Sequence, residues 1–168
     1  MTSVSPPERS LADAVERRIV RKGANAPDWS VSHAWASLDP RYRRAIVRCI
    51  DPAGDLGAAG EAVIPAEHFT LFMEVFPPGC EGGLHQHPDA EEVYVVLEGQ
   101  GVHLRFQDGE RRYVTRLQRY DVASVPAGLF RVVCNDGPDD ALVMVIFGSG
   151  RPQKAEIEPH HPMANVAR

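Results

Sequence analysis

The stretch GLHQHPDAEEVYVVLEG, Gly83–Gly99, decides the fold of this chain. His85 and His87 stand one residue apart, and Glu92 follows at the start of an apolar run that ends at a glycine. Side chains two residues apart on a strand point to the same face, so the two imidazoles are predicted to project side by side. The turn at 88–90 is expected to return Glu92 on an adjacent strand. Two imidazoles and one carboxylate predict a site for Fe(II), Mn(II), Ni(II) or Zn(II) with open coordination positions.

Short apolar segments continue on both sides of this stretch, separated by turns rich in Gly, Pro and Asx residues. Their spacing of about 8 to 12 residues predicts an all-β sandwich or barrel. The expected strands cover 43–50, 69–76, 92–98, 102–107, 111–117, 121–126, 130–135 and 141–147.

The chain is predicted to have three parts. Residues 1–65 form an N-terminal extension with one helix and one strand that pack on the barrel, 66–148 form the barrel, and 149–168 form a polar tail. The proline-bearing tail is expected to wrap the surface or to hang free. The N-terminal part also holds a long irregular segment, so the predicted fold class is an all-β barrel with a helix and an irregular extension.

The predicted N-terminal helix begins after Ser10, whose hydroxyl suits a helix N-cap. Leu11, Val15 and Ile19 recur on one helical face, and Gly23 suits the helix end. We therefore expect an amphipathic helix whose apolar face packs on the barrel.

Composition excludes several classes of partner. The 168 residues carry a net charge of −5 with no lysine-arginine run, so nucleic acid is not an expected partner. No apolar stretch has the length of a membrane span, and the first residues lack the apolar core of a secretory signal. Cys49, Cys80 and Cys134 are odd in number and show no CxxC pattern, so no disulfide framework is predicted. A cytoplasmic location is expected.

Two sequence motifs support a resemblance to a known family. The first places the histidine pair and the glutamate between two glycines, and it resembles the first motif of the cupin superfamily at every defining position: Gly79, His85, His87, Glu92 and Gly99. The second cupin motif is recognisable in YDVASVPAGLFRVVCN, where three positions agree: Pro126, Gly128 and Asn135. Tyr120 stands where glycine is usual, and Arg131 stands where the family has a histidine as fourth metal ligand. The short segment between the motifs is similar to that of bacterial single-domain cupins.

The resemblance implies a jelly-roll barrel with a metal ion at its mouth, and a homodimer. It does not fix the chemistry, because cupins include oxygenases, isomerases, lyases and ligand-binding modules. We expect a metal-dependent enzyme that acts on a small organic acid or phenol, with a mononuclear Fe(II) dioxygenase favoured. The alternatives are a Lewis-acid isomerase, cyclase or lyase, and a non-catalytic cupin that binds a small ligand.

Arg131 leaves three alternatives open, because a guanidinium cannot ligate a metal. It faces the cavity and holds an anionic substrate, it pairs with Glu92 in a metal-free site, or it turns outward to solvent. Phe72, Tyr94 and Phe130 are candidates for the substrate pocket wall. His103 could supply a further ligand, but the apolar alternation of its strand places it outside the barrel.

Overall fold

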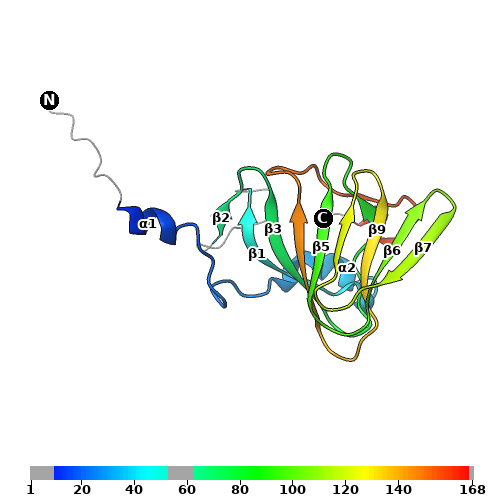
Figure 1. Cartoon of the computed structure of the whole chain (residues 1–168). Coiled ribbons are helices and arrows are strands. Elements are labelled where there is room, and N and C mark those ends of the chain that lie inside the picture. Colours follow the sequence, from blue (N-terminus) through cyan, green and yellow to red (C-terminus); the bar gives the residue numbers. More distant parts are fainter. Residues whose placement is uncertain (1–9, 53–62, 167–168) are drawn as a thin grey trace.

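The computed structural model describes residues 10–52 and 63–166, and these form two facing β-sheets (Figure 1). The six-stranded sheet has the order β2 (Ile64–Pro65), β1 (Ala45–Asp51), β3 (Thr70–Phe76), β10 (Ala141–Phe147), β5 (Glu92–Glu98), β8 (Val122–Val125). The five-stranded sheet has the order β11 (Glu156–Ile157), β4 (His85–Gln86), β9 (Phe130–Asn135), β6 (Val102–Asp108), β7 (Arg111–Arg116). Pairing is antiparallel apart from β1 with β2. The predicted all-β jelly-roll class is confirmed.

The core lies between the two sheets and follows from the two-residue period of the strands. In β10 every second side chain, from Ala141 to Phe147, is buried, and the intervening ones are partly exposed. Burying a valine such as Val143 or Val145 contributes about 1.5–3 kcal/mol. The same alternation in β5 buries Glu92 and Tyr94 on the inner face, so it brings polar groups into the barrel.

The glycine connection at 99–101 passes from one sheet to the other. The strands on either side of it do not pair with each other: β5 pairs with β10 and β8, whereas β6 pairs with β9 and β7. Gly101 has a φ of +99°, and a Cβ there would lie 2.6 Å from the backbone nitrogen of Gly137, so this crossing requires glycine. Leu104 enters the core as expected. His103 points away from it, with Nδ1 3.5 Å from a carboxylate oxygen of Asp136.

The first helix differs from the prediction. The Ser10 hydroxyl accepts the Asp13 N–H as expected, but α1 (Leu11–Glu16) ends before Ile19 and buries none of its residues. Figure 1 shows it standing away from the barrel. A six-residue helix offers only a short apolar stripe, and Leu11 on that stripe is 80% exposed.

The segment after α1 closes one end of the barrel. It contains three short helical turns: η1 (Trp29–Ser32), α2 (His33–Ala36) and η2 (Pro40–Tyr42). Trp35 and Tyr42 form a second small core with Met163, which comes from η3 (Pro162–Asn165) near the C-terminus. The polar tail is therefore an ordered part of the described structure. No helix within residues 10–52 and 63–166 is long and apolar enough to cross a membrane.

Candidate metal centre

The predicted histidine pair and glutamate converge on one point. His85 lies in β4, His87 follows that strand, and Glu92 is the first residue of β5. One ligand atom from each of the three residues lies within 4.8 Å of the others, and the two imidazole ring centroids are 5.4 Å apart. The expectation of adjacent strands is wrong, because β4 and β5 belong to different sheets and meet across the barrel.

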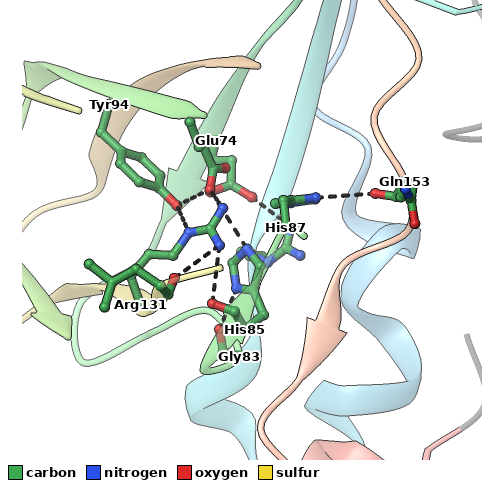
Figure 2. Close-up of polar contacts among 10 residues, drawn as sticks. Glu74, Gly83, His85, His87, Tyr94, Arg131 and Gln153 are labelled. Carbon is green, nitrogen blue, oxygen red and sulfur yellow. Dashed lines mark hydrogen bonds and ion pairs between the residues drawn. The ribbon is translucent and has the colours of Figure 1, made fainter. Parts of the chain in front are cut away.

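Backbone carbonyl groups fix the orientation of both imidazoles (Figure 2). Nδ1 of His85 lies 2.7 Å from the carbonyl oxygen of Gly83, and Nδ1 of His87 lies 3.2 Å from that of Gln153. A carbonyl oxygen only accepts, so each Nδ1 carries the proton and donates. Each Nε2 then keeps its lone pair, which is the arrangement that a metal-binding histidine requires.

The surroundings also keep the two imidazoles neutral. Burial lowers the pKa of His85 well below 6.5, and the positive charge of Arg131 lowers it further. Burial lowers the pKa of His87 as well, although the nearby Glu92 carboxylate opposes this shift. Neutral imidazole is the form that binds a metal ion, so the site is prepared for one near neutral pH.

Arg131 is buried beside the carboxylate. Its side chain is 1% exposed, and its guanidinium forms an ion pair with Oε2 of Glu92. Nε also donates to the Tyr94 hydroxyl at 3.3 Å, and another guanidinium nitrogen donates to the His85 carbonyl at 3.2 Å. The alternative in which Arg131 turns outward to solvent is therefore wrong, whereas the contact with Glu92 that the second alternative names is present.

Tyr94 completes the group around the carboxylate. Its hydroxyl donates to Oε2 of Glu92 at 2.6 Å. Burial, together with the Glu92 charge, raises the pKa of Tyr94 well above 10, so the phenol keeps its proton and remains a donor. Both bonds end on Oε2, which also lies 3.9 Å from Nε2 of His85. The donor set of two Nε2 atoms and one carboxylate oxygen fits a divalent metal.

A cavity of about 730 Å³ opens beside this group. Two of the three predicted pocket residues, Phe72 and Tyr94, line it. Phe130 is not among the lining residues, because it precedes Arg131 on β9 and points to the opposite face of the strand. Arg131 is not among the lining residues either. The other apolar lining residues include Val31, Trp35, Ile46, Phe76, Val133, Phe147, Ile157 and Met163.

Sequence reasoning missed a second charged pair in the cavity. Arg44 and Glu74 both line it, and their side chains form an ion pair at 2.8 Å. Burial raises the pKa of Glu74, while the Arg44 charge opposes this shift. The signal was present in FTLFMEVF, where Glu74 shares the inward parity of Phe72 and Phe76. The contribution of the tail through Gln153 had no comparable signal.

Comparisons with known proteins agree with this architecture. The family model described as "Cupin domain" matches residues 72–147. A germin-like protein of Arabidopsis thaliana, subfamily 3 member 3, is 38% identical over 69 residues, which cover 41% of this chain and 33% of that protein. The chain thus spans about a third of the length of the curated relatives that it matches first.

Two solved structures have a similar fold. An oxalate oxidase in complex with the substrate analogue glycolate has a TM-score of 0.61 at 18% identity, covering 90% of this chain and 69% of that one. Peruvianin-I, a cysteine peptidase from Thevetia peruviana latex, has a TM-score of 0.61 at 21% identity, covering 94% and 88%. The two proteins are named for different activities, so the likeness supports the fold alone.

Proposed function

Because this chain belongs to the cupin superfamily, we propose that it binds one divalent metal ion through His85, His87 and Glu92 and acts on a small organic acid. The observation that carries this proposal is the convergence of two Nε2 lone pairs and one buried carboxylate. A bound Fe(II) ion would supply coordination positions for O₂ and substrate, which favours a mononuclear non-heme dioxygenase. The protein groups hold the ligand atoms in place and keep the imidazoles unprotonated.

The charges around the site favour an anionic substrate. The imidazoles are neutral, and the charges of Arg131 and Glu92 cancel, as do those of Arg44 and Glu74. A divalent ion would therefore leave two positive charges in a largely buried place, which is costly unless an anion enters with it. A carboxylate substrate meets this need.

Arg131 takes a different role from the predicted substrate clamp. Its donors point to Glu92, Tyr94 and the backbone at His85, and its side chain does not line the cavity. We assign it an electrostatic role. Because it neutralises Glu92, the charge of a bound metal ion is not offset by that carboxylate, and an anionic ligand is favoured.

One observation favours a second candidate, a ligand-binding cupin that works without metal. Arg131 already neutralises Glu92, so the site is balanced in charge without a metal ion. A small polar ligand would then bind in the cavity by hydrogen bonds, without catalysis at a metal.

Metal analysis separates the two candidates. Protein purified without chelator, then incubated anaerobically with Fe(II) and desalted, is expected to hold about one iron per chain by elemental mass spectrometry. Glu92→Gln and His87→Ala should lose it, whereas His103→Ala, outside the barrel interior, should keep it. Arg131→His should bind iron more tightly, because it adds a fourth ligand. Iron bound by Arg131→His but not by the native protein would favour the metal-free candidate.

Oxygen uptake then tests the reaction class. The iron-loaded protein is expected to consume O₂ with one member of a panel of small carboxylic acids and phenols. Turnover that persists without O₂ would instead indicate Lewis-acid chemistry. A homodimer and a cytoplasmic location remain predictions, which light scattering and cell fractionation would check.

A further inference from the structure

The C-terminal strap, residues 150–163, lies outside the region that the family model matches and runs directly across the candidate site. Within it β11 pairs with β4, so Ile157 is the register partner of His85. The strap also supplies part of the cavity wall, including Gln153 and Met163. A segment that the sequence presents as a polar tail is thus in contact with the proposed ligands.

The contact with His87 runs through the backbone of the strap. The Gln153 carbonyl oxygen accepts from Nδ1 of His87 at 3.2 Å. The N–H of the same residue donates to both carboxylate oxygens of Asp89, at 3.1 Å each. Asp89 lies two residues after His87, so the carboxylate holds the strap against the same turn that carries the imidazole. Gln153 thus bonds to both His87 and Asp89, and the short chain between these two residues closes the loop.

The far end of the strap is anchored in the second small core. Met163 is 1% exposed and packs with Trp35 and Tyr42. Gly83 leaves room for it, since a Cβ at that position would lie 2.8 Å from the Met163 methyl carbon. The Gly83 carbonyl in turn accepts from His85. The strap is therefore held at both ends, each time next to a residue that orients one of the two imidazoles.

We propose that Asp89 and the C-terminal strap are positioning elements of the metal site, which fix His87 in the tautomer that presents Nε2 to the ion. This inference rests on the proposed metal binding. An imidazole whose Nδ1 has no acceptor samples both tautomers, and the form with hydrogen on Nε2 cannot bind a metal through that atom. Loss of such a hydrogen-bond partner typically weakens metal affinity by about 10–100-fold.

The test uses Asp89→Ala, with Asp89→Asn as the conservative variant that keeps an acceptor oxygen. Asp89 is exposed, so the fold should survive; Asp108→Ala, also exposed and paired with Arg111 on the neighbouring strand, is the control. In metal-free protein, ¹⁵N correlation spectra report which His87 nitrogen carries the proton. We expect hydrogen on Nδ1 in the native protein, Asp89→Asn and Asp108→Ala, and a mixture in Asp89→Ala. Zn(II) titration should show weakening of about 10–100-fold in Asp89→Ala alone.

The outcomes distinguish this inference from the proposed function. If no variant, including the native protein, binds Zn(II) but the tautomer shifts in Asp89→Ala, the proposed metal function fails and the positioning role of the strap stands. If Asp89→Ala keeps hydrogen on Nδ1, or shifts the tautomer without weakening Zn(II), the inference is overturned. The same two measurements, the protonated nitrogen of His87 and the Zn(II) affinity, are made on Met163→Ala and Met163→Leu to test the other end of the strap.

Discussion

The buried pair of Arg131 and Glu92 makes a strong prediction about stability. Arg131→Met removes the guanidinium, keeps much of the volume, and leaves an unpaired carboxylate at a side chain that is 4% exposed. Breaking a buried ion pair costs about 3–5 kcal/mol of unfolding free energy. In a chain of this length each kcal/mol lowers the melting temperature by about 2–4 °C, so a fall of about 6–20 °C is expected. Urea unfolding in EDTA, followed by circular dichroism, measures the loss.

A double-mutant cycle identifies the cause. Glu92→Gln keeps an acceptor for the Tyr94 hydroxyl, so Arg131→Met combined with Glu92→Gln should recover most of the stability. The control is Arg111→Met, which removes an exposed pair with Asp108 and should cost at most about 1 kcal/mol. A loss below 1 kcal/mol in Arg131→Met, or a double variant no more stable than that single one, would refute the reasoning.

Three further predictions concern single groups. Because burial lowers the pKa of His85, the unfolded chain binds a proton below about pH 6.5 at this residue while the folded chain does not. Urea titrations in EDTA should therefore show that the free energy of unfolding falls as the pH is lowered from 7.5 to 5.5, and falls less in His85→Gln. Tyr120 has a φ of +72° at the position where glycine is usual, so Tyr120→Gly should gain up to about 1 kcal/mol in thermal unfolding, whereas Tyr113→Gly, in strand β7, should lose stability. Burial raises the pKa of Cys134 to about 12, so mass spectrometry after a thiol reagent at pH 8 should find Cys49, which is partly exposed, modified well before Cys134.

The strands and the ligand set could be predicted because both depend on local sequence. Alternation with a period of two gives β3, β5 and β10 their inner faces, and the spacing of His85, His87 and Glu92 places three ligands near a turn. Strand pairing does not depend on local sequence alone, because the same residues at 99–101 could close a hairpin or connect the two sheets. The resemblance identified Arg131 as a departure, but its partner depends on β5, which lies in the other sheet.

The tail shows the other limit of sequence reasoning. It has no apolar period, and its prolines and charges are typical of a solvated end. Its placement depends on long-range fits, above all that of Met163 over Gly83 and that of Gln153 between Asp89 and His87. Such contacts can be predicted only when the three-dimensional arrangement of the barrel is known.

The position of β1 beside β3 has a consequence for any attempt to isolate the barrel. The stretch matched by the family model begins at residue 72, so excision along that boundary would remove β1 and expose the edge of β3. Bare backbone donors and acceptors beside apolar side chains are a template for cross-chain strand addition and fibril growth. In the described structure β1 therefore covers this edge of β3 with a paired strand.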